Sequence, residues 1–332
     1  MNVAVRTVRI AVDVMGGDNA PQVVLEGVEQ ALAVDPLLTV ALTGRPDVIE
    51  HFALQHPERV VAVAASETIG MDEHPAQAVR KKKDSSIAVG CRLVREGSAD
   101  GFFSAGSTGA CMAAATLYIG RLKGVIRPAI ATVIPSPVAP VVFTDIGANA
   151  DAKPDYLVQF AQMAAVYARC LLNIEQPRIG LLNIGEEESK GSTLAQEAFK
   201  LMKKKVVGFC GNVEGTDILT GRFDVIVTDG FTGNITLKTI EGTAGVLFDQ
   251  LKQTLTASAP RKLAALPLMS ELRKLKKSLS ADEIGGAPLL GLKGSCIIGH
   301  GSSNVQAIAN GIAQTARCAR EQVPEIIAKA VS

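Results

Sequence analysis

The sequence predicts an α/β protein with a mostly parallel sheet, and three observations support this fold class. Short apolar runs rich in Val and Ile alternate with segments whose apolar residues recur at helical spacing. Strands that alternate with helices favour right-handed crossovers, which make neighbouring strands parallel. The chain has 332 residues, 47% of them hydrophobic, which is enough for one large domain or two lobes.

The first half of the chain alternates strands with helices. Its strands are predicted at Thr7–Val14, Leu37–Thr43, Arg59–Ala64 and Asp100–Phe103. Its helices are predicted up to about Val34, over Pro46–His56, from a capping Asp84 or Ser85 to Glu96, and after Gly109 to about Arg121. The polar segment between Ala64 and Asp84 is expected to be a loop.

The second half continues the alternation. Its strands are predicted at Ala129–Ile134, Val138–Thr144, Arg178–Ile184, Val206–Cys210, Asp224–Thr228 and Lys293–Ile298. Its helices are predicted over Tyr156–Leu172, Thr193–Lys204, the segment after Asn234, and the C-terminal segment after Asn304. After Asn234 the apolar residues Leu237, Ile240, Leu247 and Leu251 recur at helical spacing, which is typical of an amphipathic helix.

Composition excludes several classes of protein. The formal net charge is +1, with 34 basic against 33 acidic residues, so the basic excess typical of nucleic-acid binding is absent. The six cysteines are far apart and lack CxxC spacing, which indicates reduced packing thiols in a reducing compartment. No signal peptide or membrane-spanning run is visible, so a cytoplasmic protein is expected.

Small and polar residues follow six of the predicted strands. In parallel sheets ligands collect at the carboxyl ends of strands, where glycine allows close backbone approach and Ser, Thr and Asn donate hydrogen bonds. None of the loops matches a nucleotide-binding fingerprint. The pattern therefore predicts an anion site, most often for phosphate, built from several loops. These loops are Gly16–Asn19, Ser104–Gly109, Asp145–Asn149, Gly185–Gly191, Asp229–Asn234 and Gly299–Asn304.

Two side chains in these loops are candidates for chemistry. Lys190 stands just before a helix start and could hold phosphate or stabilise an oxyanion, although most loop lysines are simply solvated. His300 lies between glycines after a strand and could be a general acid or base, or equally a packing histidine. No nucleophile elbow, Cys–His pair or metal-ligand cluster is visible, so no metal or cofactor is expected.

Residues 260–280 differ in kind from the rest of the chain. Between Arg261 and Lys277 six basic residues stand against one acidic residue, a net charge of 6 − 1 = +5, interleaved with leucines. This pattern fits an interfacial amphipathic helix pair on anionic lipid. It fits a helical hairpin in a dimer interface about as well, because dimers also bury leucine stripes.

Seven motifs, in order, resemble the bacterial PlsX family of acyl-ACP:phosphate acyltransferases. They are RIAVDVMGGDNAP, RKKKDSS, SAGSTGA, DIGANAD, NIGEEESKGS, FDVIVTDGFTGNITLK and GLKGSCIIGHGSSN, and the match runs from Arg9 to about residue 310. The resemblance implies transfer of a long-chain acyl group from acyl carrier protein to inorganic phosphate, giving acyl-phosphate for phosphatidic acid and phospholipid synthesis.

The resemblance also implies an architecture and partners. The family fold is similar to the three-layer α/β/α folds of phosphotransacetylases and isocitrate/isopropylmalate dehydrogenases. We expect a single domain over residues 1–332 with an amphipathic helical protrusion around 258–282. A homodimer is implied, with peripheral contact to anionic membrane and to the downstream glycerol-3-phosphate acyltransferase. The membrane-contacting residues would be Leu263, Leu266 and Leu268.

The implied reaction suggests roles for the loop residues. Phosphate is already an anion at neutral pH, so the protein needs to position it and to stabilise an oxyanion rather than supply a nucleophile. The expected catalytic residues are Lys190, Asn234 and His300. The expected substrate-binding residues are Asp13, Gly16, Gly17, Asp18, Ser107, Thr108, Gly109, Asp145, Asn149, Asp229, Gly230 and Gly233.

Acyl carrier protein is acidic, so a basic docking surface is expected. The most compact candidate is Arg80, Lys81, Lys82 and Lys83, and Lys203–Lys205 is the second. Three alternatives to the main function stay open: a phosphotransacetylase-like enzyme that uses a CoA thioester, a dehydrogenase of related fold, and a non-enzymatic membrane scaffold for lipid synthesis.

Overall fold

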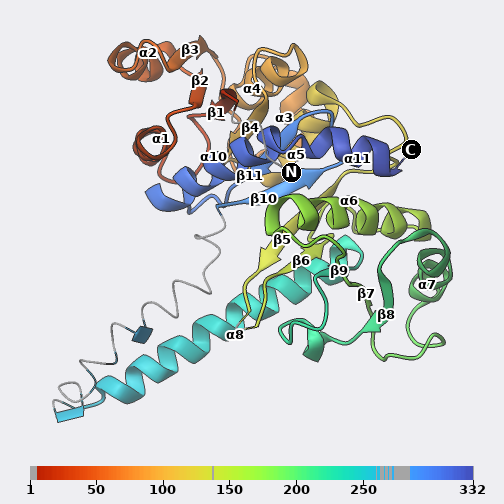
Figure 1. The fold of residues 1–332 in the computed structure, drawn as a ribbon. Helices are drawn as coiled ribbons and strands as arrows, with labels where there is room; N and C mark the ends of the chain where they lie inside the picture. The colour runs from red at the N-terminus through yellow and green to blue at the C-terminus, as the bar shows by residue number, and fades with distance from the viewer. Residues whose placement is uncertain are drawn as a thin grey trace.

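The computed structural model describes residues 6–136, 138–258, 260–261, 265, 268, 271–272 and 285–331. Within these residues the strands form one 11-stranded sheet in the order β3-β2-β1-β4-β11-β10-β5-β6-β9-β7-β8 (Figure 1). Its strands are β1 (Val8–Asp13), β2 (Leu38–Gly44), β3 (Val60–Ala64), β4 (Gly101–Ser104), β5 (Ala129–Ile134), β6 (Val141–Thr144), β7 (Ile179–Leu182), β8 (Phe209–Val213), β9 (Val225–Val227), β10 (Ala287–Leu290) and β11 (Ser295–Ile298). The predicted α/β class with a mostly parallel sheet is confirmed.

Helices connect most of the strands. They are α1 (Gln22–Val34), α2 (Pro46–Gln55), α3 (Pro75–Lys81), α4 (Ser86–Arg95), α5 (Thr108–Ala114), α6 (Pro154–Leu172), α7 (Thr193–Lys205), α8 (Gly230–Thr256), α10 (Val305–Arg320) and α11 (Val323–Val331). A π-helical turn (Ala115–Ile119) continues α5, and a 3₁₀ turn (Gly215–Asp217) follows β8.

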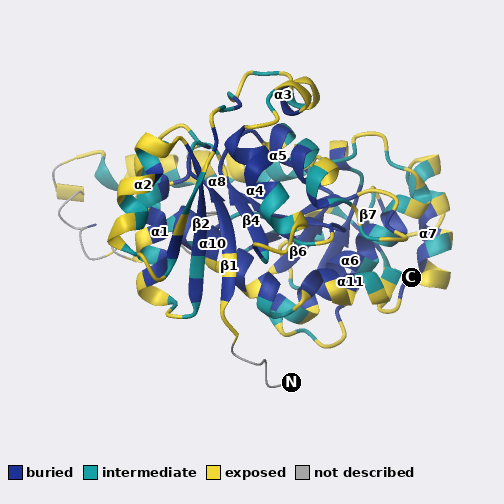
Figure 2. Cartoon of the chain, turned by 90° about the horizontal axis from the view of Figure 1, so that it is seen from above, coloured by how far each residue is buried: buried dark blue, intermediate teal, exposed yellow. Residues whose placement is uncertain are grey.

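The helices cover both faces of the sheet, which gives three layers. Alternate residues of β1 point to opposite faces: Ile10 and Val12 join a core cluster with α1, α6 and α10, whereas Ala11 joins a second cluster with α4 and α5. A third, smaller cluster packs α8 on β6 and β9. Figure 2 shows the strands buried between helices whose outer faces are exposed.

The sheet consists of two parallel halves that run in opposite directions. Strands β1–β4 and β11 form one half, in the upper part of Figure 1, and β6–β9 form the other. The short strands β10 and β5 join the halves through antiparallel pairs. Ala287 at the start of β10 pairs with Ile298 at the end of β11.

The registers of these central strands bring the two sets of strand ends together. Leu289 of β10 pairs with Ile130, and the next residue of β5, Ala131, pairs with Thr144 at the end of β6. The carboxyl ends of both halves therefore face a shared region at the centre of the sheet. Loops from both halves can contribute to one site there.

Several element boundaries differ from the sequence prediction. Strand β10 and helix α3 were not predicted, because β10 is short and contains Pro288, and α3 lies in a polar segment without helical apolar periodicity. Pro75 at the first turn of α3 is well suited to a helix start. Strand β8 is Phe209–Val213 rather than Val206–Cys210, because Val206 instead caps the C-terminus of α7.

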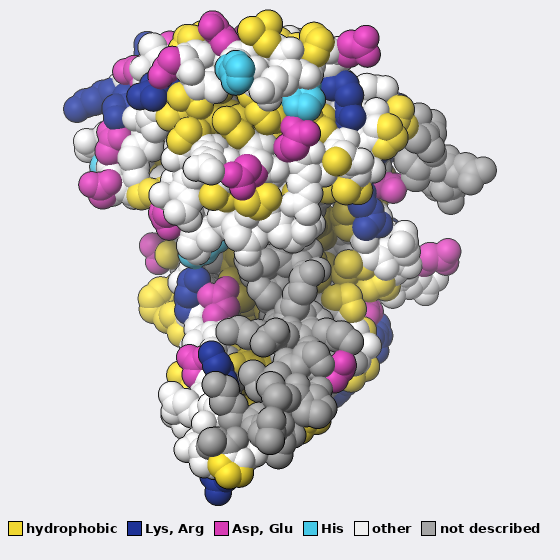
Figure 3. All heavy atoms as spheres, turned by 90° about the vertical axis from the view of Figure 1, so that its left-hand side faces the viewer, with side chains coloured by type: hydrophobic (Ala, Val, Ile, Leu, Met, Phe, Trp, Pro, Cys, Tyr) yellow, Lys and Arg dark blue, Asp and Glu magenta, His cyan; other side chains and the backbone are white. Residues whose placement is uncertain are grey.

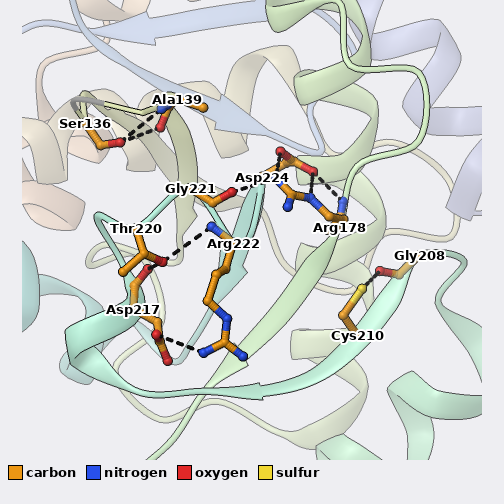
Figure 4. A network of polar contacts seen from close by, with 10 residues as sticks. All are labelled: Ser136, Ala139, Arg178, Gly208, Cys210, Asp217, Thr220, Gly221, Arg222 and Asp224. Atoms are coloured by element: carbon orange, nitrogen blue, oxygen red, sulfur yellow. Dashed lines mark hydrogen bonds and ion pairs between the residues drawn. The ribbon is translucent and has the colours of Figure 1, made fainter.

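A polar network stabilises the half that contains β7 and β9 (Figure 4). The guanidinium of Arg178 donates to both carboxylate oxygens of Asp224 at 2.9 Å, and its backbone N–H donates to Asp224 Oδ2 at 2.7 Å. A second guanidinium, of Arg222, donates to Asp217 Oδ1 at 3.0 Å. These contacts tie the β8–β9 connection to the start of β7.

Helix α8 is 27 residues long and extends away from the sheet at the lower left of Figure 1. Leu237 and Ile240 of its apolar stripe pack on the sheet, whereas Leu247 and Leu251 further along are 64% and 41% exposed. No described helix has the length and hydropathy to cross a membrane.

Besides the exposed leucines of α8, hydrophobic side chains gather in the upper part of the view in Figure 3, over α1 and α2. Leu25, Ala33 and Phe52 line a shallow groove there, and Glu26 and Glu29 lie at its edge.

Candidate functional site

Three of the predicted loops meet at the ends of the neighbouring strands β1, β4 and β11. The buried Asp13 accepts hydrogen bonds from Ser104 Oγ at 2.7 Å and from Met15 N–H at 3.1 Å. Ser104 Oγ in turn accepts the N–H of Gly106 at 3.0 Å. Burial raises the pKa of Asp13 above the usual 3.8, and these hydrogen bonds partly offset the rise. Asp13 therefore fixes the two loops to each other.

Close backbone approach explains the glycines of the first loop. A Cβ on Gly16 would lie 2.5 Å from Asp13 Oδ2 and 2.7 Å from the amide nitrogen of Gly106, so a larger residue would separate the loops. The next loop residue, Gly17, has φ +112°, which favours glycine. The N–H of Asp18 donates to Gly301 O at 2.8 Å, which attaches the third loop.

In the other half of the sheet, Asp145 organises the loop after β6. The carboxylate is completely buried and accepts the N–H groups of Ile130 and Ala148, both at 3.1 Å, and of Asn149 at 2.7 Å. Burial raises the pKa of Asp145, and these donors partly offset the rise. The structure thus gives this predicted substrate-binding residue a role in holding its loop, and direct contact with substrate stays a prediction.

The start of α8 packs against that loop. Asp229 caps the helix by accepting the N–H of Thr232 at 2.9 Å, so α8 begins at Gly230 rather than after Asn234 as predicted. The N–H of Gly230 donates to Asn149 O at 2.8 Å. A Cβ on Gly233 would lie 1.9 Å from Asp145 O, so this helix can approach the loop only with glycine there.

A cleft of about 200 Å³ lies between the two sets of loops. It brings together three predicted site residues from different elements: Thr108 at the start of α5, Asn234 in the first turns of α8, and His300 after β11. Asn234 Nδ2 donates to Ile146 O at 3.1 Å, which orients its amide. The apolar part of the lining comes from Ile130, Ile146, Leu237, Ala287, Ile298 and Ala307.

His300 has a defined hydrogen-bonding environment. Its Nδ1 accepts the N–H of Ser302 at 3.2 Å and lies 2.8 Å from the hydroxyl of the same serine. A ring nitrogen that accepts an N–H carries no proton, so the neutral imidazole carries its proton on Nε2. In this tautomer the Nε2–H can donate a hydrogen bond to a ligand.

A second cavity of about 390 Å³ lies on the other side of α8. Thr232 and Thr236 line it, whereas Asn234 lines the cleft, because residues two apart on a helix point in nearly opposite directions. Gly191 also lines the second cavity, and the neighbouring Lys190 lies 48% exposed with Nζ 3.9 Å from Glu187 Oε1. Among the predicted catalytic residues, only Asn234 and His300 line the cleft.

The predicted basic docking surface lies on and after α3. Arg80, Lys81 and Lys83 are exposed, whereas Lys82 donates to Glu73 Oε1 at 2.6 Å and is tied to its own loop. The start of α3 packs on α5, since a Cβ on Gly109 would lie 2.6 Å from the ring of Pro75. The exposed cations are therefore carried by a helix next to the one that contributes Thr108 to the cleft.

The predicted membrane residues are only partly described. Leu263 and Leu266 lie outside the described residues. Leu268 is 55% exposed and lines an open apolar pocket with Leu251 and Leu255 of α8.

Three polar residues of the cleft lie outside the predicted loops, namely Thr132, Lys238 and Glu241, whereas Ser303 belongs to the predicted loop Gly299–Asn304. Lys238 could have been found, because it stands four residues after Asn234 and so shares its helix face. Thr132 could not, since it is one residue within an apolar strand.

Solved structures with the same fold support the architecture. A phosphotransacetylase from Streptococcus pyogenes has a TM-score of 0.62 at 18% identity, over 97% of this chain and 96% of that one. A 4-hydroxythreonine-4-phosphate dehydrogenase from Klebsiella pneumoniae has a TM-score of 0.52 at 15% identity, over 96% and 100% of the two chains. At these identities the likeness concerns the fold alone, and it agrees with both folds expected from the resemblance.

Sequence comparisons identify the family. Two curated phosphate acyltransferases are similar along nearly their whole length. The one from Desulfitobacterium hafniense (strain Y51) is 49% identical over 97% of this chain and 96% of its own, and the one from Brevibacillus brevis is 45% identical over 96% of each. The family model described as fatty acid synthesis protein matches residues 8–326. The chain therefore belongs to this family, the PlsX family that its motifs indicate.

Proposed function

We propose that this protein transfers a long-chain acyl group from acyl carrier protein to inorganic phosphate, giving acyl-phosphate for phosphatidic acid and phospholipid synthesis. The observation that carries the proposal is the cleft, which combines an apolar lining from both halves of the sheet with hydrogen-bond donors at Thr108, Asn234 and His300. An acyl chain fits the apolar part, and phosphate and the thioester carbonyl fit the donors. The names of the curated relatives agree with phosphate as acceptor.

The proposed reaction needs no nucleophile from the protein. A phosphate oxygen attacks the thioester carbonyl carbon, the carbon–sulfur bond breaks, and the released thiolate takes up the proton that hydrogen phosphate carried. The buried cysteines are poor alternatives as nucleophiles, since burial raises the pKa of Cys111 to about 12 and that of Cys91 well above its usual value.

The residues of the cleft supply position and charge stabilisation. Asn234 Nδ2 has a second N–H besides the one given to Ile146 O, and this group can donate to the oxyanion. His300 is proposed to relay to the leaving thiolate the proton that hydrogen phosphate gives up, so that its imidazole is neutral again at the end of the step. Lys190 retains its proposed role in oxyanion stabilisation, for which its loop would have to reach the acyl carbonyl from the far side of α8.

We propose that the exposed residues Arg80, Lys81 and Lys83 dock the acidic carrier protein. Helix α3 packs against α5, so a carrier docked there would lie on the neighbour of the helix that contributes Thr108 to the cleft. Opposite charges across such an interface raise the association rate.

The proposal is tested by mixing the protein with palmitoyl-acyl carrier protein and phosphate and detecting palmitoyl-phosphate by mass spectrometry. We expect product only when all three components are present. Palmitoyl-CoA in place of the carrier substrate tests the phosphotransacetylase-like alternative, and a clear preference for CoA would replace acyl carrier protein as donor. No product from either donor, with the protein folded, would favour the scaffold alternative.

We also propose a cytoplasmic homodimer that contacts anionic membrane through the protrusion around 258–282, within a single domain. The exposed Leu247 and Leu251 of α8, together with Leu268, support an apolar contact at this place.

L266E/L268E should abolish co-sedimentation with anionic vesicles while light scattering still gives a dimer. Loss of the dimer instead would assign the leucines to the subunit interface. A nearby membrane would also bring the product to the downstream glycerol-3-phosphate acyltransferase.

A further inference from the structure

One wall of the cleft is a polar face of α8 that extends beyond Asn234. Asn234, Lys238 and Glu241 are four and three residues apart, so their side chains lie along one face of the helix. All three line the cleft. The rest of the polar lining comes from the loop after β11, which contributes His300 and Ser303, and the first turn of α10 contributes Ala307.

Among the described residues that line this cleft, Lys238 is the only lysine or arginine. Phosphate near neutral pH carries between one and two negative charges, and the acyl-phosphate product retains negative charge. A phosphate bound beside Asn234 therefore needs a nearby cation. Lys190 does not supply one within this lining, because its loop lies beside the second cavity.

The electrostatic surroundings add to the case for an anion near Lys238. Helix α10 is 16 residues long, and its first turn reaches the cleft through Ala307. The N-terminal end of a helix carries partial positive charge, so it and Lys238 both favour an anion in the cleft.

We propose that the ammonium group of Lys238 binds the phosphate substrate and that, when phosphate is absent, this group forms an ion pair with Glu241. This inference rests on the proposed phosphate acyltransfer. Lys238 Nζ donates to Glu241 Oε2 at 2.7 Å, with the two side chains 56% and 43% exposed. An exposed pair of this spacing on one helix is weak. Phosphate replaces Glu241 because it also gains the donors of the loop after β11.

The kinetic test compares charge removal with charge conservation. K238M should raise the KM for phosphate about tenfold or more, because it removes one charge-assisted hydrogen bond to the phosphate. The KM for the acyl donor should change less than about twofold, and K238R should restore most of the phosphate affinity because it keeps the positive charge. E241Q should lower the KM for phosphate, since it removes the competing carboxylate.

The matched control is K252M, a change of the same kind further along α8 and outside the cleft. It should leave the KM for phosphate unchanged. Thermal unfolding of each variant shows whether the fold is intact. A phosphate KM that is the same in K238M and wild type would overturn the inference, as would an equal rise in K252M.

A second measurement does not depend on turnover. Reductive methylation with and without inorganic phosphate, followed by peptide mass spectrometry, reports how accessible each lysine is. Phosphate should slow the methylation of Lys238 and leave that of Lys252 unchanged. Protection of Lys238 without any acyl-phosphate formation would support this site and contradict the proposed reaction. Acyl-phosphate formation without protection would overturn the site and leave the reaction standing.

Discussion

Single residues hold the loops of this protein in place through buried carboxylates. Asp13 and Asp145 each accept hydrogen bonds from the backbone of the loop that follows their strand, one in each half of the sheet. The energetic cost of burying each carboxylate is partly offset by these donors, and the pKa of each stays raised. Both aspartates therefore act on the site through the loops they hold.

Gly233 offers a sharp test at this scale. G233A should destabilise the fold by about 2 kcal/mol or more, because the added Cβ would lie 1.9 Å from Asp145 O and must push the loop away. G242A on the same helix meets no atom within 4 Å and should stabilise by about 0.5–1 kcal/mol. Urea unfolding measures both, and equal effects would mean that the close approach is unimportant.

A substitution at Lys190 tests its predicted role in stabilising the oxyanion. K190A should lower turnover about a hundredfold if its ammonium stabilises the oxyanion. Stability should change by less than about 0.5 kcal/mol, since the side chain is half exposed and its ion-pair distance is 3.9 Å. Steady-state kinetics and thermal unfolding separate the two effects, with the exposed Lys200 changed to Ala as control. Turnover like that of wild type would remove Lys190 from the mechanism.

At the scale of elements, α8 determines which loop residues can act together. Its first turns form a wall between the cleft and the second cavity, with Asn234 facing one side and Thr232 the other. The same helix then extends past the sheet with exposed apolar side chains. Its N-terminal part thus belongs to the site, and its C-terminal part offers a surface for a membrane or a second subunit.

Helix α3 is the element predicted to recognise the carrier protein. K81E/K83E should raise the KM for acyl carrier protein substrates about tenfold and leave the KM for phosphate unchanged, because the charges lie outside the cleft lining. The effect should shrink at high salt. K203E/K204E on α7 is the matched variant. A larger rise of the KM in K203E/K204E than in K81E/K83E would place the docking surface on α7. No rise in either variant would exclude both basic segments as the docking surface.

At the scale of the whole molecule, the two halves of the sheet depend on different polar contacts. In the second half, the pKa of Asp224 is lowered: burial raises it, but hydrogen bonds from Arg178 and its positive charge outweigh that effect. The carboxylate of Asp224 is 10% exposed, so its pairing with Arg178 contributes to the stability of this half.

The lowered pKa gives a pH dependence of defined sign. The unfolded chain binds a proton at Asp224 before the folded one does, so stability from this pair is present above the ordinary carboxyl pKa of 3.8 and is lost as pH falls through the lower folded pKa. D224N should be about 1–2 kcal/mol less stable than wild type at pH 7. Urea unfolding at several pH values should show this difference shrinking below pH 3.8, and a constant difference would contradict the assignment.

The site could be predicted from the sequence in part. The Gly, Ser and Asn residues after each strand indicated which loops carry polar groups, and Thr108, Asn234 and His300 do line one cleft. Lys238 was missed because its charge on an exposed helix looks like any solvated lysine. Lys190 looked more suitable, but its position relative to the cleft depends on strands far away in the sequence.

The sequence by itself determined the alternation of strands and helices and the polar loops, because apolar periodicity and turn residues act over a few neighbours. Only the tertiary structure decided which loops meet. That choice depends on the antiparallel pairing of β10 with β5, which joins segments about 160 residues apart and connects the two halves of the sheet. Since no local pattern encodes this long-range pairing, the cleft between the two halves follows from the fold as a whole.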